Sequence, residues 1–202
     1  MHFLKELVFA TNNPHKLQEI GALLGKSFTL HGLKDLGIRD QLPEDHETLE
    51  ENASQKAWYV YRNFRMNCFA DDTGLEVEAL GGDPGVYSAR YSRIGDPVFP
   101  DMEVSAGNIK KLLLKMEGLQ NRKARFRTVI ALVLSGKEHL FEGVVEGEII
   151  QKPAGNEGFG YDPVFRPAGY DITFAQMDLS MKNRISHRAQ AVGRLVEFLR
   201  GM

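Results

Sequence analysis

Two adjacent carboxylates, Asp71 and Asp72, are the side chains of this sequence best suited to acid–base or metal chemistry. They follow an apolar run, Cys68 to Ala70, that is typical of the end of a buried strand. Apolar and acidic residues then alternate, which predicts a second strand and places the pair at a Thr73-Gly74 turn. Because successive strand residues point to opposite faces, we expect one carboxylate to face a site and the other to support it. An Asp-rich turn without a catalytic role is the competing interpretation.

A strand, a polar turn and a helix start follow one another near the N-terminus. The apolar run Leu7 to Ala10 predicts the strand, and Asn13 is suited to cap a helix whose first residue is Pro14. Backbone amides and the helix dipole converge at such a helix start, which is a common way to build a phosphate site. The glycines of a Walker loop are missing, and a plain capped helix explains the same residues.

A long helix is predicted from Thr48 to Arg65, because apolar residues recur along it at helical spacing. Its first residues match a capping box, in which the side chain of Glu51 reaches back to the Thr48 amide. The same carboxylate can instead serve as a metal ligand, and the sequence leaves both interpretations of Glu51 open. Asn52 and Lys56, one turn apart, indicate a polar wall beside it.

The second half of the chain predicts a central strand, a glycine-rich loop and a basic helix start. Lys123 to Leu134 is apolar on both faces toward its end, as expected of a central strand. The irregular segment Lys152 to Tyr170 holds Phe159 between glycines, which suits a planar ligand, although packing against the core explains it as well. The last helix is expected to open at Lys182 with several cations, which the helix dipole disfavours there unless an anion is bound.

The composition is that of an ordinary globular protein. Hydrophobic residues make up 43% and charged residues 26% of the 202 residues, and 25 basic against 27 acidic side chains give a net charge of -2. No global field therefore attracts nucleic acid or a membrane, and an anion site has to be built locally. Cys68 is the only cysteine, which excludes an internal disulfide, and its apolar neighbours favour a buried structural thiol. No apolar run approaches the roughly 20 residues that span a bilayer, and residues Met1 to Glu6 lack a signal-peptide pattern, so we expect a cytoplasmic protein.

Strands and helices alternate along the chain in an order that predicts an α/β fold with a mixed sheet. Taken in this order, the motifs resemble those of the inosine and xanthosine triphosphate pyrophosphatase family. The resemblance runs from Leu7 to about Leu199, and no single motif carries it alone. The matching segments are Thr11-Asn12-Asn13 with Lys16, Glu51-Asn52-Ala53 with Lys56, Ala70 to Leu75, Pro84 to Tyr91, Gly158 to Pro163, and Lys182 with Ser186-His187-Arg188.

The resemblance implies a long twisted mixed sheet flanked by helices, with residues 1–202 forming one domain of two lobes around a central active-site cleft. It also implies a homodimer that requires Mg²⁺ and hydrolyses deaminated purine nucleoside triphosphates to the monophosphate and pyrophosphate. Glu51 and Asp72 are the implied Mg²⁺ ligands. Asp72 is also the implied base for the attacking water, with Asp71 as its support.

The same resemblance implies how the substrate is held. Lys16, Lys56 and Lys182 supply charges for the phosphates, and Thr11 and Asn13 donate hydrogen bonds. Base selection then falls to stacking on Phe159, to Asp162 and His187, and to a hydrogen bond from Arg188 to a 6-keto oxygen. The other implied substrate-binding residues are Asn12, Pro14, His15, Thr73, Gly160, Tyr161 and Ser186.

Two other classes of protein compete with this interpretation. A Maf-like nucleotide pyrophosphatase would act on thymidine or uridine triphosphates, but the Phe159 loop and Ser186-His187-Arg188 argue against it. A nucleotide-binding protein without catalysis would not require the three carboxylates of Glu51, Asp71 and Asp72.

Overall fold

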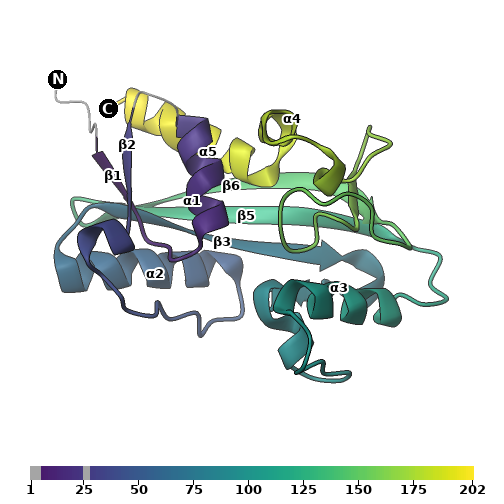
Figure 1. Cartoon of the computed structure of the whole chain (residues 1–202). Coiled ribbons are helices and arrows are strands. Elements are labelled where there is room, and N and C mark those ends of the chain that lie inside the picture. The colour runs from purple at the N-terminus through teal and green to yellow at the C-terminus, as the bar shows by residue number, and fades with distance from the viewer. Residues whose placement is uncertain (1–5, 25–27) are drawn as a thin grey trace. The chain divides into compact units, whose positions relative to one another are not determined.

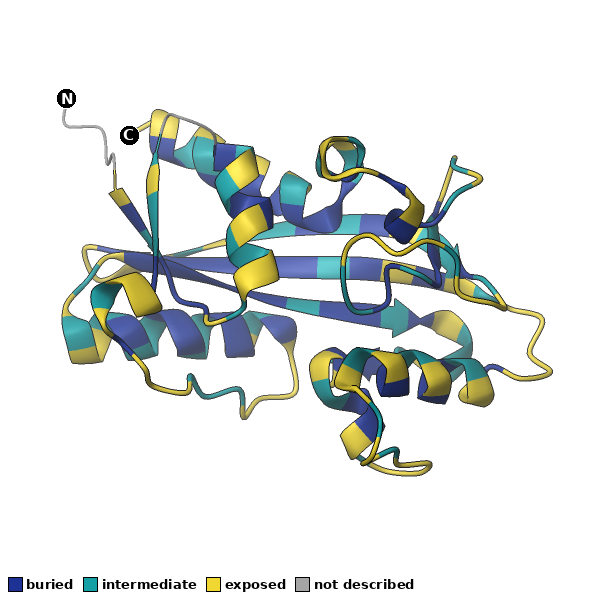
Figure 2. Ribbon diagram, viewed as in Figure 1, coloured by how far each residue is buried: buried dark blue, intermediate teal, exposed yellow. Residues whose placement is uncertain are grey.

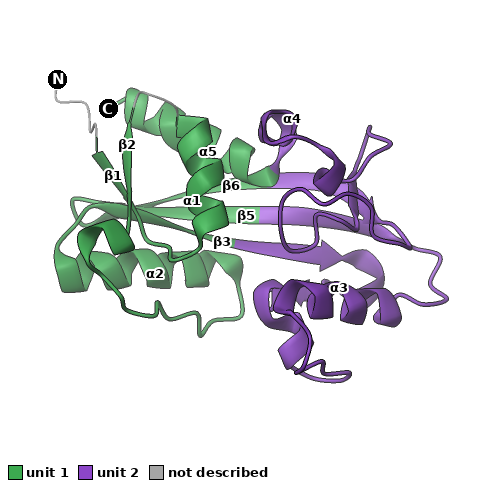
Figure 3. Ribbon diagram, viewed as in Figure 1, with its two compact units in different colours: residues 1–72, 128–143, 187–202 green, residues 73–127, 144–186 purple. Residues whose placement is uncertain are grey.

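The structure is a computed structural model of the 202-residue chain and describes residues 6–24 and 28–202. The chain forms two units (Figure 3): unit 1 comprises residues 1–72, 128–143 and 187–202, and unit 2 comprises residues 73–127 and 144–186. Three strands contribute residues to both units, namely β3 (Cys68–Val77), β5 (Lys123–Leu134) and β6 (Lys137–Ile149). Of residues 1–6, which carry the prediction that a signal peptide is absent, the first five lie outside the described residues.

Unit 1 contains the parallel part of the sheet. Strand β1 (Glu6–Phe9) pairs in parallel with β2 (Thr29–Gly32) and with β3, so the strand order begins β2-β1-β3 and continues to β5 and β6. Parallel neighbours need crossover connections. Helices α1 (Pro14–Leu24) and α2 (Leu49–Phe64) supply them, and α5 (His187–Arg200) lies beside α1 on the face of the sheet opposite α2 (Figure 1).

The core of unit 1 is built where these helices cover the strands. Phe9 and Phe69 are register partners on β1 and β3, and their rings stack with centroids 4.7 Å apart. Apolar residues of α1 and α5 pack over the strands on the same face, because both helices carry apolar stripes at helical spacing. Figure 2 shows the resulting buried band along β3 and β5.

Unit 2 contains two antiparallel strand pairs and a second core. Strand β4 (Pro84–Gly85) pairs with β3, and β7 (Phe165–Pro167) pairs with β6. Aromatic rings of Phe126, Phe165 and Phe174 fill this core, with centroids 4.7 to 6.1 Å apart. Its helices are α3 (Val104–Lys115) and α4 (Leu179–Ile185), with short 3-10 turns η3 (Glu78–Leu80), η4 (Ser88–Arg93) and η5 (Phe174–Gln176).

Several predictions from the sequence are confirmed. Parallel and antiparallel pairs coexist with flanking helices, so the sheet is mixed and the fold is α/β. The strand from Lys123 to Leu134 has the predicted bounds and lies between β3 and β6. Cys68 is buried, its Sγ lies 3.2 Å from the Ala57 carbonyl oxygen, and burial raises the pKa of its thiol to about 12.

The predicted turn at residues 71–74 is wrong, because β3 runs without interruption from Cys68 to Val77. Gly74 is needed for close packing instead: a Cβ atom there would lie 2.7 Å from the carbonyl oxygen of Gly85 on β4. A glycine within a strand often marks such a close approach of another backbone. Asp71 and Asp72 are therefore consecutive residues inside a strand.

Two other predictions about the last third of the chain are also corrected. The helix expected to open at Lys182 is two helices, and Ser186 separates them in an extended conformation as the C-cap of α4. Lys182 thus lies in the last turn of α4, where the helix dipole favours a cation. The segment between Lys152 and Tyr170 includes strand β7, although it was expected to contain no regular element. Among the helices of the described residues, none has the length and apolarity to cross a membrane.

Candidate active site

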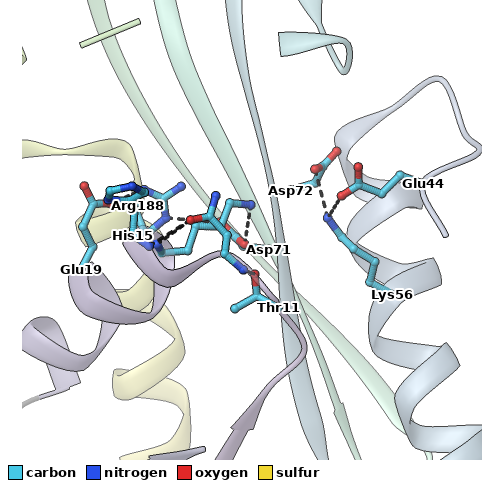
Figure 4. Close-up of polar contacts among 10 residues, drawn as sticks. Thr11, His15, Glu19, Glu44, Lys56, Asp71, Asp72 and Arg188 are labelled. Atoms are coloured by element: carbon cyan, nitrogen blue, oxygen red, sulfur yellow. Dashed lines mark hydrogen bonds and ion pairs between the residues drawn. The ribbon is translucent and has the colours of Figure 1, made fainter. Parts of the chain in front are cut away.

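Three helices of unit 1 bring charged side chains to the two carboxylates of β3 (Figure 4). Helix α1 supplies Lys16, α2 supplies Lys56 and α5 supplies Arg188. The N-terminal half of β3 is buried on both faces, since helices cover the sheet on each side, so Asp71 and Asp72 are both buried. Charges in such surroundings must be paired, and the pairing determines what each carboxylate can do.

Asp71 is paired with two cations. Its Oδ1 accepts a hydrogen bond of 2.8 Å from Lys16 Nζ, and Arg188 Nε lies 3.3 Å from its Oδ2. Burial opposes ionisation, but Lys16 and Arg188 together hold the pKa of Asp71 well below its ordinary range. Burial in turn lowers the pKa of Lys16, although Asp71 counteracts this. Asp71 is therefore a permanent anion that orients two cations.

Arg188 also forms an ion pair with Glu19, a buried carboxylate of α1 that sequence reasoning missed. Burial acts to lower the pKa of Arg188, but Asp71 and Glu19 outweigh it and raise the pKa. A signal for Glu19 was present in the sequence: it precedes Ile20 on the apolar stripe of α1 and lies three residues after Lys16. An acidic residue at the edge of an apolar helix face needs a buried partner.

Asp72 is surrounded differently from its neighbour. Its Oδ1 lies 3.1 Å from Lys56 Nζ, which is also 2.5 Å from Glu44 Oε1. Its Oδ2 is buried and has no hydrogen-bond partner among the described residues. Burial raises the pKa of Asp72 above its ordinary value, because the lost hydration outweighs the attraction of Lys56. Asp72 is thus the better base of the two, and one of its oxygens is available to a ligand.

The start of α1 is capped as the sequence predicts. Asn13 Oδ1 accepts hydrogen bonds from the amides of His15 and Lys16, at 3.0 and 3.3 Å, and Thr11 Oγ1 accepts one from the Asn13 amide. Asn12, Pro14 and His15 are exposed. The cap therefore fixes the first turn of α1, and Lys16 in that turn reaches Asp71.

Glu51 is exposed and takes part in the cap of α2. The Thr48 hydroxyl accepts a hydrogen bond from the Glu51 amide at 3.2 Å and donates one to Glu51 Oε2 at 2.8 Å. The carboxylate thus bonds the Thr48 hydroxyl, whereas the sequence predicted the Thr48 amide. No group of three or more His, Cys, Asp or Glu side chains able to hold a metal occurs among the described residues.

A second set of predicted site residues lies in unit 2. Lys182 Nζ lies 2.6 Å from Asp162 Oδ2, and both side chains are buried. The same Oδ2 accepts a hydrogen bond from the Phe159 amide, and the Lys182 ammonium lies 5.1 Å from the centroid of the Phe159 ring. Gly158 adopts a φ of 73° next to them, and a Cβ there would lie 2.0 Å from Asp162 Oδ2. The glycines of this loop thus let its backbone wrap around the Asp162 carboxylate.

The remaining predicted residues are distributed over both units. Tyr161 is buried and donates a hydrogen bond to the Ser88 carbonyl oxygen at 3.0 Å, which anchors the Phe159 loop, and Gly160 is partly buried. Ser186 and His187 are buried where α4 ends and α5 begins, and Thr73 is the first residue of unit 2 on β3.

Arg188 and Lys182 have surroundings that differ from the predicted ones. Arg188, expected to contact a base, lies with Asp71 and Glu19, and Lys182, expected to contact phosphates, lies with Phe159 and Asp162. The spacing of residues along the chain gave no sign of these surroundings, because Lys182 and Arg188 belong to two helices rather than one.

Comparison with known proteins gives a consistent result. The sequence model of the Ham1 family matches residues 7–198. A dITP/XTP pyrophosphatase from Porphyromonas gingivalis is 49% identical over 197 residues, which covers 97% of this chain and 98% of the relative, and one from Flavobacterium johnsoniae is 45% identical over 194 residues, covering 96% and 97%. The structure of a HAM1 protein from Coxiella burnetii is 35% identical, with a TM-score of 0.85, and the match covers 98% of this chain and 100% of that one.

Proposed function

The chain belongs to the Ham1 family, and from this membership and the site we propose that it hydrolyses deaminated purine nucleoside triphosphates. The substrates are ITP, dITP and XTP, and the products are the nucleoside monophosphate and pyrophosphate. The observation that carries the proposal is the contrast between the two carboxylates of β3: Asp71 is held as an anion, and Asp72 has a raised pKa and an unbonded buried oxygen. A strand that carries a fixed anion next to a base suits the activation of water beside a polyanion.

Asp72 deprotonates and orients the attacking water. Burial gives it a higher pKa than an ordinary Asp, which makes it a stronger base at neutral pH. Asp71 supports it by fixing Lys16 and Arg188. Because the proton acceptor and the cations are held by strand and helix residues, little reorganisation is needed when charge develops on the phosphate oxygens.

Lys16 and Lys56 bind the phosphates together with the amides at the start of α1, near Thr11 and Asn13. Phosphoryl transfer depends mostly on positioning and charge neutralisation, and both lysines are ion-paired to the carboxylates of β3. Burial acts to lower the pKa of Lys56, but Asp72 and Glu44 outweigh it and raise the pKa, so Lys56 is a stable cation at neutral pH. Thr73, Asn12, Pro14 and His15 complete the phosphate-binding set.

The donor set fits Mg²⁺. That ion binds through one or two carboxylates together with substrate phosphates and waters, so a cluster of three acidic side chains is not required. Asp72, through its buried and unbonded Oδ2, and the exposed Glu51 are the residues that would hold it. When bound, Mg²⁺ supplies neutralisation of phosphate charge and lowers the pKa of a bound water.

The purine base is selected by residues of the Phe159 loop and of the junction between α4 and α5. Phe159 stacks on the base, and Lys182, held by Asp162 beside the Phe159 ring, donates to a 6-keto oxygen. An adenine amino group would face a donor instead, which discriminates against ATP. Gly160, Tyr161, Ser186, His187 and Arg188 complete the base-binding set.

Two further properties belong to this proposal. We expect a homodimer, and light scattering of the purified protein should give about twice the monomer mass of 22.7 kDa. We also expect the protein in the cytoplasm, where its nucleotide substrates are found, and cell fractionation would test this.

A substrate panel tests the function. Purified protein with Mg²⁺ is incubated with ITP, XTP, ATP, GTP, dTTP and UTP, and released pyrophosphate is measured. We expect pyrophosphate release from ITP and XTP at rates at least about 100-fold above those for ATP. Chelation of Mg²⁺ should abolish this release. Preference for dTTP or UTP, or release of orthophosphate alone, would refute the proposal.

A further inference from the structure

Unit 1 contains a hollow with two cations, Lys34 and Arg39, that the proposed mechanism does not use. It has a volume of about 440 Å³ and is lined by Asn12, Lys34, Gly37 and Arg39. Lys34 and Arg39 are exposed, and neither side chain makes a hydrogen bond or ion pair with another described residue, although the Lys34 carbonyl oxygen accepts the Gly37 amide. Two cations and a carboxamide thus line a concave surface, and we call this the Lys34–Arg39 hollow.

The backbone that carries these cations is held in place. Lys34 begins the 3-10 turn η2 (Lys34–Leu36), which Gly37 ends with a φ of 73°, a conformation that favours glycine. Beyond it, Ile38 is buried, and the Asp40 carbonyl oxygen accepts a hydrogen bond of 3.1 Å from Asn12 Nδ2. The two cations are therefore presented from a fixed turn that is tied to Asn12.

Two carboxylates near the hollow, those of Asp35 and Asp40, keep their charge but are bonded to other partners. The carboxylate of Asp35 accepts the Gly32 amide at 2.8 Å, and that of Asp40 accepts the Tyr59 hydroxyl at 2.9 Å. Neither residue lines the hollow. An anion that enters it would meet two positive charges at the protein surface.

The catalytic cluster by itself is poorly matched to a polyanion. Its four carboxylates are Asp71, Asp72, Glu19 and Glu44, and its three cations are Lys16, Lys56 and Arg188, which leaves a net charge of -1. A triphosphate therefore requires positive charge beyond that of this cluster, from Mg²⁺ when it is bound and from further side chains. Lys34 and Arg39 provide two positive charges in the hollow. Asn12 also lines the hollow, and it lies between Thr11 and Asn13 at the start of α1.

We propose that Lys34 and Arg39 bind the distal phosphates of the substrate and the departing pyrophosphate, an inference that rests on the proposed function. The phosphate nearest the nucleoside lies at the carboxylates of β3, and the rest of the triphosphate extends past the start of α1 into the Lys34–Arg39 hollow. This contact distinguishes triphosphates from monophosphates, because a nucleoside monophosphate has no group that reaches the hollow.

Binding of inorganic pyrophosphate and of inosine monophosphate tests the proposal by calorimetry at fixed Mg²⁺. Lys34→Ala and Arg39→Ala should each weaken pyrophosphate binding about 3- to 10-fold, the scale of a charge-assisted contact at an exposed site, and the double variant about 10-fold or more. Inosine monophosphate should bind all variants equally. Lys137→Ala removes an exposed cation of unit 1 that does not line the hollow, and it should leave both affinities unchanged. Lys34→Arg and Arg39→Lys keep the charge and should retain most of the affinity.

Several outcomes would overturn the proposal. Wild-type protein that does not bind pyrophosphate, or variants that bind it normally, would show that the hollow does not take phosphate. An equal loss of monophosphate binding would show a general effect on the site. Failure of the proposed function is a separate result. The protein would then bind pyrophosphate through Lys34 and Arg39 but release none from ITP or XTP. That outcome would support the phosphate site and refute only the proposed reaction.

Discussion

Asp71 and Asp72 are consecutive residues of one strand, yet their surroundings favour opposite protonation behaviour. Asp71 has two cationic partners and a lowered pKa, whereas Asp72 shares Lys56 with Glu44 and has a raised pKa. Ionised Asp72 therefore lowers the stability of the folded state at neutral pH, and ionised Asp71 raises it. Active sites commonly maintain such a base at the expense of stability.

The matched variants Asp72→Asn and Asp71→Asn test this contrast. Asp72→Asn should lower kcat by at least about 100-fold, the scale of general base catalysis, and raise the free energy of unfolding at pH 7 by roughly 1 kcal/mol. Asp71→Asn should lower the free energy of unfolding by about 3 kcal/mol, because it leaves the partly buried Lys16 and the buried Arg188 without their negatively charged partner. Denaturant titrations measure both, and loss of stability in Asp72→Asn would contradict the assignment.

The pH dependence of these differences supplies a control. A carboxylate with a lowered pKa in the folded state contributes stability above its unfolded-state pKa, near 4, and this is lost as the pH falls through the folded-state pKa. The stability difference between wild type and Asp71→Asn should therefore be constant at neutral pH and shrink below about pH 4. A difference that is independent of pH would attribute the effect to side-chain packing.

Glu51 is the proposed Mg²⁺ ligand beside Asp72, and Glu44, which shares Lys56 with Asp72, is the alternative tested against it. Gln also serves at the third position of a capping box, so Glu51→Gln should not alter folding. If Glu51 is a Mg²⁺ ligand, this change should raise the Mg²⁺ concentration for half-maximal activity by about 10-fold or more, the scale of losing a metal-site partner. Glu44→Gln is the matched comparison, because Glu44 contacts Lys56 beside Asp72. A shifted Mg²⁺ dependence in Glu44→Gln alone would move the ligand role to Glu44.

Lys182 and Lys16 separate base selection from phosphate binding. Lys182→Gln removes the charge next to Phe159, and it should reduce the ratio of kcat/KM for ITP to that for ATP by about 10-fold or more. Lys16→Gln should lower both values by similar factors, since both substrates carry the same phosphates. Circular dichroism checks folding, because Lys182→Gln leaves Asp162 with a weaker partner. If Lys182→Gln leaves the ratio of kcat/KM for ITP to that for ATP unchanged, Lys182 does not select the base and is better assigned to phosphate binding.

At the scale of elements, strand β3 matters because it carries the carboxylates and also continues into the contact with β4. That contact requires Gly74, where a Cβ would lie 2.7 Å from a backbone oxygen. Gly74→Ala should therefore destabilise the protein by about 1–3 kcal/mol, the usual cost of overpacking. Gly193→Ala in α5 is the control, because no atom outside the neighbouring helix backbone lies within 4 Å of the added Cβ, and it should stabilise by about 0.5–1 kcal/mol. Thermal unfolding of both variants measures these effects, and a tolerated Gly74→Ala would contradict the packing requirement.

At the scale of the whole molecule, each unit has its own core, but β3, β5 and β6 contribute to both cores. We therefore expect one cooperative unfolding transition. Trp58, the only tryptophan, lies in unit 1 and reports on that unit. Leu112→Ala, in the core of unit 2, should cost about 2–5 kcal/mol and shift the midpoint of Trp58 fluorescence as far as that of circular dichroism.

Leu195→Ala in the core of unit 1 is the positive control, because it must shift the Trp58 transition whether the two units unfold together or independently. A fluorescence midpoint that Leu112→Ala leaves unchanged would mean that the two units unfold independently. The two probes in Leu112→Ala therefore distinguish cooperative from independent unfolding of the two units.

The sequence by itself determined those features that depend on neighbours along the chain. Periodicity marked β5 and α2, capping chemistry marked Asn13 and Thr48, and the set of motifs in order indicated the family. Each helix, strand, cap or single motif is encoded within one short stretch of the chain, and local propensity and the fold agree there.

Only the tertiary structure decided which charges meet. Glu19 and Arg188 pair across 169 residues of sequence, and Lys16 and Asp71 across 55. No periodicity encodes such contacts, because they arise from the packing of helices on a shared sheet. For the same reason, Gly74 suggested a turn, whereas it lies within β3 and leaves room for the Gly85 backbone on β4. The opposite pKa shifts of Asp71 and Asp72 follow from these distant partners, since burial and ion pairing exist only after the chain has folded.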